Sequence, residues 1–245
     1  MWSSIKQIIK PDTLDEADNL KKQSGTLVFA GGSYLVNARD KNFHTLLDIN
    51  HLLSEKIQKQ GTGLLIGAGC TLQQLVEQGD SETLSQVITS SCPSKNIRNQ
   101  RTLGGEIARG RTDSDLLVYL YATETQLQVN DGDSFIDINE WNDKGVISNI
   151  FIPENKTRSE RVAVLDSAPA FVIISVNQMQ DSIALAIGGK TEEILFSKIA
   201  LIPDELEIRN LMDRIQSNFA DDQHGTASFK QHLVSTLLSR MSEAE

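Results

Sequence analysis

The chain has 245 residues, a net charge of −10, and 39% hydrophobic but only 5% aromatic residues. This length suits one large domain or roughly two to three small ones, with a mainly aliphatic core. The acidic balance argues against a general nucleic-acid binder, which needs a basic face. Apolar runs such as residues 170–176 are too short to span a membrane, and no secretion signal opens the sequence. We therefore expect a cytoplasmic protein.

Cysteine and histidine usage argues against a metal site on this chain. Cys70 and Cys92 are the only cysteines and belong to no CxxC pair, and the four histidines lack HxxxH or HExxH spacing. We expect ordinary reduced thiols. Any iron–sulfur cluster would have to lie on another polypeptide.

The first fifty or so residues predict a small α/β unit. Thr13 and Glu16 have the spacing of a capping box, and Gly25 fits a helix C-terminus. Residues 26–30 (TLVFA) and 45–49 (TLLDI) have the apolar and β-branched content of buried strands.

A second unit begins with a strand at residues 63–69 (GLLIGAG). Thr71 and Gln74 form another capping box, which opens a helix that Gly79 closes. Ser114 or Asp115 is expected to cap a further helix.

The rest of the chain predicts a hairpin at residues 127–138 and a strand at 146–152. The polar residues 154–161 (ENKTRSER) are the best candidate for a linker. Two strands, 170–176 and 182–189, and two helices follow. The last helix has Thr226 as its expected cap and one apolar face, formed by Leu233, Val234, Leu237, Leu238 and Met241.

Three glycine turns are expected to end strands: residues 30–35 (AGGSYL), 66–72 (IGAGCTL) and 102–107 (TLGGEI). Glycine backbone can come close to a ligand, so its N–H groups can converge on an anion. A glycine pair alone is usually an ordinary tight turn. The second turn could suggest a Rossmann fingerprint, but Leu72 stands where the third glycine is required.

Basic residues gather around the third turn of this acidic chain: Lys95, Arg98, Arg101, Arg109 and Arg111. A local positive field over exposed backbone donors suits a diphosphate. A solvated basic face, or a surface that docks onto an acidic partner, explains the cluster equally well.

Four stretches in this order resemble the flavin-binding subunit of the molybdenum hydroxylases, the family that includes xanthine dehydrogenase and aerobic carbon monoxide dehydrogenase. They are AGGSYL, TLLDI, IGAGCTLQQL and IRNQRTLGGEIARGRTDSDLL. The resemblance runs from about Leu27 to Thr123. It continues more weakly to a shortened C-terminal part.

The resemblance implies an α+β fold. Residues 1–55 and 56–155 would be two α/β subdomains forming a PCMH-type FAD-binding fold. Residues 160–245 would be a small C-terminal domain with an antiparallel sheet and helices.

The resemblance also implies FAD as cofactor, with backbone N–H groups of two glycine loops on its pyrophosphate. The stretch Ile97–Asn99 matches the approach to the second loop. No catalytic residue is expected, because the flavin performs the redox chemistry. The implied cofactor contacts are Ala30, Gly31, Gly32, Ser33, Tyr34, Thr102, Gly104, Gly105, Glu106 and Asp115.

As a member of this family, the chain would be a flavoprotein subunit of a molybdopterin-dependent oxidoreductase. It would pass electrons from iron–sulfur clusters to the flavin and on to NAD or another acceptor. Its partners would be a molybdopterin-binding large subunit and a 2Fe-2S small subunit. No nucleic acid or membrane partner is expected.

Two residues depart from the family pattern. Glu106 stands where the family usually has asparagine, and Tyr34 where it has aspartate or asparagine. A carboxylate beside a diphosphate is repulsive, by about 1 kcal/mol at about 4 Å in water. Either the arginines offset this repulsion or Glu106 points away. The alternative hypothesis is a scaffold subunit that keeps the fold but has lost the flavin.

Overall fold

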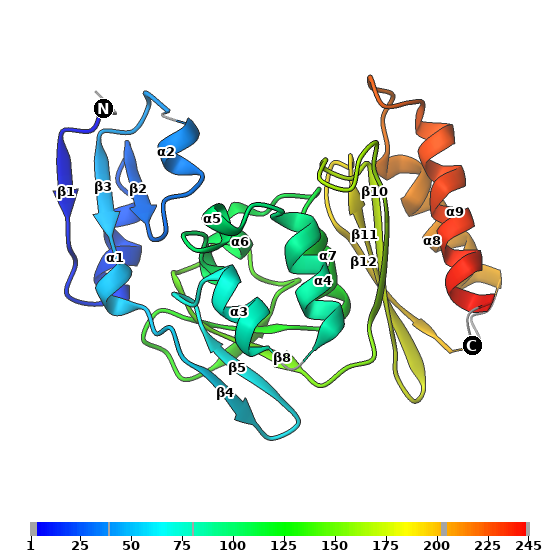
Figure 1. Cartoon of the computed structure of the whole chain (residues 1–245), viewed down its shortest axis with the longest axis horizontal. Coiled ribbons are helices and arrows are strands. Elements are labelled where there is room, and N and C mark those ends of the chain that lie inside the picture. Colours follow the sequence, from blue (N-terminus) through cyan, green and yellow to red (C-terminus); the bar gives the residue numbers. More distant parts are fainter. Residues whose placement is uncertain (1–3, 39, 80, 202–204, 244–245) are drawn as a thin grey trace. The chain divides into compact units, whose positions relative to one another are not determined.

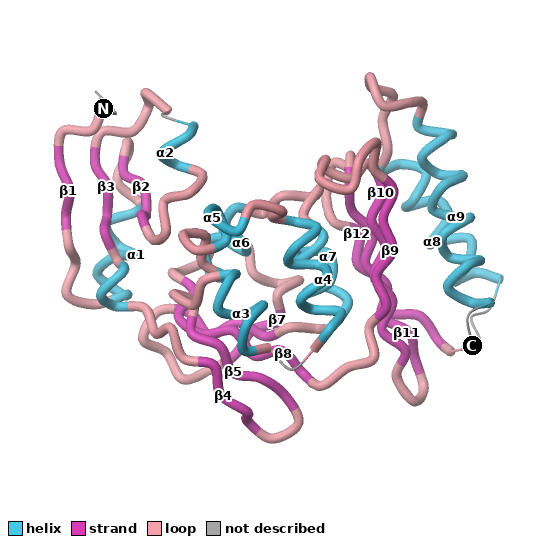
Figure 2. The backbone as a smooth tube through the Cα atoms, viewed as in Figure 1, coloured by secondary structure: helices cyan, strands magenta, loops and turns pink. Residues whose placement is uncertain are grey.

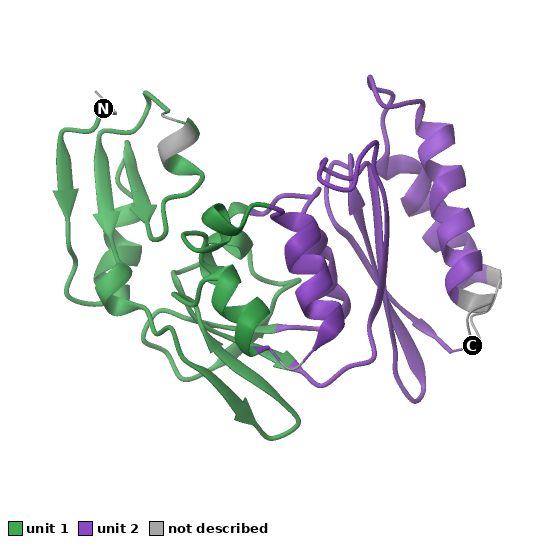
Figure 3. Ribbon diagram, in the orientation of Figure 1, with its two compact units in different colours: residues 1–78, 94–109, 126–152 green, residues 79–93, 110–125, 153–245 purple. Residues whose placement is uncertain are grey.

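The computed structural model describes residues 4–38, 40–79, 81–201 and 205–243 (Figure 1). Helices are combined with three separate sheets, which confirms the predicted α+β class. The chain forms two compact units (Figure 3). Unit 1 comprises residues 1–78, 94–109 and 126–152, and unit 2 comprises residues 79–93, 110–125 and 153–245. The three domain ranges expected from the sequence stay a prediction, and the compact units interleave along the chain.

The first sheet of unit 1 is parallel. Its strands, in spatial order, are β1 (Gln7–Ile9), β3 (Thr45–Asp48) and β2 (Thr26–Phe29). Helix α1 (Leu14–Lys21) packs on it through Leu14 and Ala17, which share a core with Leu47 and Ile49. The Thr13 hydroxyl accepts from the Glu16 N–H at 3.1 Å, which confirms the predicted helix start.

The second sheet of unit 1 has five strands, in the order β4 (Ile57–Gln60), β5 (Gly63–Gly67), β8 (Ile147–Pro153), β6 (Gln126–Val129) and β7 (Phe135–Asp137). The antiparallel β6–β7 pair confirms the predicted hairpin. Strand β5 pairs antiparallel with β4, unlike a strand of a Rossmann βαβ unit.

Unit 1 also contains short helices: α2 (Leu35–Ala38), η1 (Asn50–Leu52), α3 (Leu72–Gln78), α5 (Lys95–Arg98) and α6 (Leu103–Arg109). The capping box that opens α3 is complete. The Gln74 N–H donates to Thr71 Oγ1 at 3.2 Å, and the Thr71 N–H donates to Gln74 Oε1 at 2.7 Å.

The prediction that residues 102–107 end a strand is wrong, because these residues open helix α6 after the short helix α5. The N–H groups of Leu103 and Gly104 donate to the carbonyls of Cys70 and Ala68, at 2.9 and 3.0 Å. A Cβ on Gly104 would lie 2.7 Å from Ala68 Cβ. The glycine thus allows the first turn of the helix to lie directly against the strand-to-helix turn at Ala68.

Unit 2 contains one antiparallel sheet (Figure 2). Its strands are β12 (Leu195–Ala200), β11 (Ser182–Gly189), β10 (Val172–Gln178) and β9 (Arg158–Val162). Successive residues of β10 face opposite sides. Val172 and Ile174 pack against α8 (Glu205–Asn218) and α9 (Ala227–Glu243), while Ile173 packs against α7 (Asp115–Ala122).

The helices of unit 2 agree with the sequence patterns. Thr226 caps α9 by accepting from the Phe229 N–H at 3.2 Å, and Val234, Leu237 and Met241 are buried. Ser114, rather than Asp115, caps α7. Helix α4 (Glu82–Ser91) packs beside α7. Within the described ranges, no helix is long and apolar enough to cross a membrane.

The linker expected at residues 154–161 is wrong in its second half, because Arg158–Val162 form β9. Among the strands that the structure describes, β9 pairs only with β10, and it lies at the edge of its sheet. Edge strands are commonly rich in charged residues, which disfavour pairing with other chains. The polar sequence was therefore compatible with a strand.

Both cysteines are predicted to resist thiol reagents in the native protein. Cys70 and Cys92 are buried. Burial raises the pKa of the Cys70 thiol to about 12, and the Glu55 carboxylate adds to the rise. We expect Ellman's reagent near neutral pH to modify neither thiol until denaturant is added, and then both. Rapid modification of the native protein would contradict this packing.

Candidate functional site

The first and third glycine turns meet in unit 1. A Cβ on Gly31 would overlap the carbonyl oxygen of Gln100 and lie 3.3 Å from Thr102 Cγ2. The first turn therefore rests directly on the chain that leads into the other turn, an approach that only glycine permits. We call the residues of these two turns, Ala30–Ser33 and Thr102–Gly105, the glycine cradle.

The main-chain donors of the cradle are distributed unequally. The N–H groups of Gly31 and Gly32 donate to no described residue. Gly32 has φ +67°, and a Cβ there would run into the Phe29 ring. In contrast, the Gly104 N–H donates to the Ala68 carbonyl, and the Gly105 N–H to Thr102 Oγ1 at 3.2 Å. The donors available for an anion therefore lie mainly in the first turn.

The basic cluster is not a free positive field, because its members have partners. Arg98 is buried and its Nε donates to Gln73 Oε1 at 2.9 Å. Lys95 forms an exposed ion pair with Glu77, 3.4 Å apart. Exposed pairs of this kind contribute little to stability.

The two residues that depart from the family pattern both contact arginines of the cluster. Glu106 is only 1% exposed, and its Oε2 lies 3.3 Å from Arg101 Nη1. Tyr34 is 44% exposed, and the Arg109 guanidinium lies over its ring, 3.6 Å from the centroid. Glu106 is therefore turned into the protein rather than into solvent.

Asp115 lies in unit 2 and is only 3% exposed, at the N-terminus of α7. Its Oδ1 is 3.0 Å from Arg161 Nε. Burial raises the pKa of the Asp115 carboxyl to about 6, although Arg161 opposes the rise. The guanidinium also donates to the carbonyls of Asp166 and Ala168, both at 2.6 Å. Asp115 thus takes part in an internal network of unit 2.

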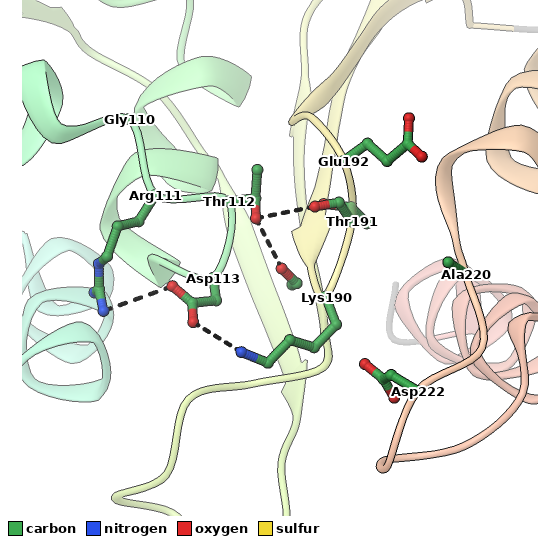
Figure 4. A pocket seen from close by; sticks show the side chains of 10 residues that line it. Gly110, Arg111, Thr112, Asp113, Lys190, Thr191, Glu192, Ala220 and Asp222 are labelled. Carbon is green, nitrogen blue, oxygen red and sulfur yellow. Dashed lines mark hydrogen bonds and ion pairs between the residues drawn. The ribbon is translucent and has the colours of Figure 1, made fainter.

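Unit 2 contains a cavity of about 500 Å³, and several charged residues are among those that line it (Figure 4). Asp113 lies between two cations, 3.5 Å from Arg111 and 3.2 Å from Lys190. The cavity contains none of the predicted contacts. Its lining comprises Gly110, Arg111, Thr112, Asp113, Gly189, Lys190, Thr191, Glu192, Ala220 and Asp222.

The walls of this cavity are held by hydrogen bonds and an ion pair. Thr112 Oγ1 donates to the carbonyls of Gly189 and Thr191, at 3.0 and 3.2 Å. The fully buried Lys230 donates to the Ala220 carbonyl at 2.7 Å and pairs with Asp222 at 2.9 Å. Sequence reasoning missed the cavity because it joins segments far apart in the chain. The glycine pair at the end of β11 was the available signal.

The glycine cradle lies in a part of the chain that matches a known protein family. The family model described as the FAD binding domain in molybdopterin dehydrogenase matches residues 3–153. The chain belongs to this family. Its cofactor is FAD, and the match includes both turns of the glycine cradle.

Curated relatives agree over part of the chain. The uncharacterized protein YgfM of Escherichia coli strain K12 is 29% identical over 133 residues, which are 53% of this chain and 51% of that protein. The match thus spans about half the length of this relative.

Solved structures share the fold over most of the chain. Carbon monoxide dehydrogenase from Hydrogenophaga pseudoflava matches with a TM-score of 0.72 at 17% identity, over 96% of this chain and 95% of that one. The enzyme from Oligotropha carboxidovorans gives 0.73 at 17% identity, over 96% and 95%. Quinoline 2-oxidoreductase from Pseudomonas putida 86 gives 0.73 at 18% identity, over 96% and 94%.

The residues of the cradle fit the diphosphate of FAD. Gly31 and Gly32 have backbone N–H groups that donate to no described residue, in a turn whose close packing on Gln100 and Phe29 requires glycine. Ser33 and Arg101 add side-chain polar groups beside them, with Arg101 Nε 3.4 Å from Ser33 Oγ. Such a set suits an anion with several acceptor oxygens.

Replacing Gly31 with alanine is predicted to disrupt the cradle. The added methyl group would meet the Gln100 carbonyl and force the turns apart. We expect FAD affinity to fall about ten-fold or more, because hydrogen bonds to a charged group are worth about 1.5–3 kcal/mol. Isothermal titration with FAD tests this, with Gly132→Ala as a matched control in an exposed turn. Unchanged affinity in Gly31→Ala would contradict the assignment.

Asp115 is predicted to make stability depend on pH. Its pKa is about 6 in the folded protein against an ordinary 3.8, so the folded state binds this proton more tightly. The free energy of unfolding of the parent, relative to Asp115→Asn, should fall as pH rises from about 4 to about 6, by at most about 3 kcal/mol. Denaturant titrations of both proteins across this range measure the difference. A difference that rises with pH would contradict the prediction.

Proposed function

We propose that this chain is the FAD-binding electron-transfer subunit of a molybdenum hydroxylase complex. In this role it passes electrons from iron–sulfur clusters to the flavin and on to NAD or another acceptor. The observation that carries the proposal is the glycine cradle, in which two turns of a chain from this family meet in one unit.

The partners in this proposal are a molybdopterin-binding large subunit and a 2Fe-2S small subunit. Support comes from the family and from the fold shared with carbon monoxide dehydrogenase, an enzyme with a molybdenum cofactor whose Mo-pyranopterin moiety is missing from the Hydrogenophaga pseudoflava structure. A cytoplasmic location, suggested by composition, is part of the same proposal.

The contribution of the protein itself is binding and orientation. Gly31 and Gly32 would donate backbone N–H groups to the diphosphate, while Ala30 is held through its carbonyl, which accepts from Asn50 Nδ2 at 3.4 Å. FAD, when bound, supplies the electron-accepting and electron-donating chemistry. The predicted contact of Asp115 with the cofactor stays a proposal, because Asp115 belongs to unit 2 and pairs there with Arg161.

A scaffold subunit without flavin is the second candidate. The observation that favours it is the internal use of the Gly104 N–H, which leaves the second turn with fewer donors than the family pattern implies. In this candidate the fold would serve only to join partner subunits.

Flavin retention separates the two candidates. We expect the purified protein, mixed with FAD and desalted, to keep the visible flavin absorption bands. A colourless protein with no measurable FAD affinity would overturn the proposal in favour of the scaffold. In that case Glu106→Asn provides the follow-up, since binding created by this change would identify Glu106 as the cause of the loss.

A further inference from the structure

We propose that Arg101 is a side-chain ligand of the FAD diphosphate and that Glu106 is the residue that positions it. This inference rests on the proposed FAD binding. It assigns a role to the carboxylate that departs from the family pattern, which would otherwise only repel the diphosphate.

The Arg101 guanidinium contacts the first turn of the glycine cradle and the residue that follows the second turn. Its Nε lies 3.4 Å from Ser33 Oγ in the first turn. Its Nη1 lies 3.3 Å from Glu106 Oε2, directly after the second glycine pair. Arginine carries five N–H donors in one plane, and no described residue accepts from Arg101 Nη2. That group remains for an oxygen of the ligand.

The backbone of Arg101 is fixed on both sides. Its N–H donates to the Ile97 carbonyl and its own carbonyl accepts from the Leu72 N–H, both at 2.9 Å. The preceding residue, Gln100, is the one against which Gly31 packs. The Arg101 side chain is therefore attached to a backbone that is held in place close to the N–H groups of the first turn.

The two charged side chains, Glu106 and Arg101, are buried to different extents. The Glu106 side chain is 1% exposed and that of Arg101 is 14% exposed, so the guanidinium is the solvent-accessible member of the pair. A buried carboxylate without a partner is unfavourable, but a paired one can hold a guanidinium in one orientation. In this pair the Glu106 carboxylate holds the Arg101 guanidinium in place instead of repelling the diphosphate, and a guanidinium suits phosphate oxygens.

A double-mutant cycle tests both roles. Arg101→Gln removes the ligand, and Glu106→Leu removes the support while keeping a similar volume. We expect each single change to weaken FAD binding about ten-fold or more, because one charge-assisted hydrogen bond is lost or misplaced. The double variant should bind no more weakly than Arg101→Gln, since Glu106 acts through Arg101.

Stability provides the independent readout. Each single variant removes one member of the Arg101–Glu106 pair and keeps the opposite charge, whereas the double variant removes both charges, so its thermal unfolding temperature should recover toward that of the parent. Lys144→Gln, an exposed charge loss in unit 1 with no described contact to the cradle, should change neither quantity.

Two outcomes would overturn the inference. Recovery of parental FAD affinity in the double variant would show that Arg101 only neutralises Glu106. Additive losses would show that Glu106 does not act through Arg101. A parent chain that fails to bind FAD is a different result, because it refutes the proposed function itself.

Discussion

The close approach of Gly31 to the Gln100 carbonyl is the constraint on which the candidate site depends. A side chain at position 31 would separate two turns that lie some seventy residues apart in the chain. With glycine there, the N–H groups of Gly31 and Gly32, which donate to no described residue, lie beside the segment that opens α6. The first turn follows β2 at the edge of the parallel sheet. The second turn is held by the packing of Leu103 and Gly104 on the strand-to-helix turn at Ala68.

The concentration of arginines in an acidic chain is explained by pairing rather than by a broad field. Arg98 is held by Gln73, Arg101 by Glu106, and Arg109 by the ring of Tyr34. Glu106 neutralises Arg101, whereas Gln73 and the Tyr34 ring orient Arg98 and Arg109 without cancelling their charge. Local geometry therefore decides the chemistry of the site more than the summed charge does.

Much of the fold was predictable where local patterns are strong. The capping residues Thr13, Thr71 and Thr226 and the apolar face of α9 carry their signals within a few positions of each other. The predicted secondary structure was wrong where tertiary contacts determine whether a segment forms a strand or a helix. Residues 158–161 form a strand because β10 pairs with them, and residues 102–107 begin a helix because Ala68 and Cys70 accept their N–H groups. The cavity of unit 2 and the Arg101–Glu106 pair likewise depend on contacts that sequence spacing does not reveal.

The central claim is that two turns of unit 1 form one diphosphate site. A crystal structure of the protein grown with FAD tests this claim most directly. The account predicts diphosphate oxygens within hydrogen-bonding distance of the backbone nitrogens of Gly31 and Gly32 and of the Arg101 guanidinium. Diphosphate density that touches neither residues 30–33 nor residues 101–105 would contradict it.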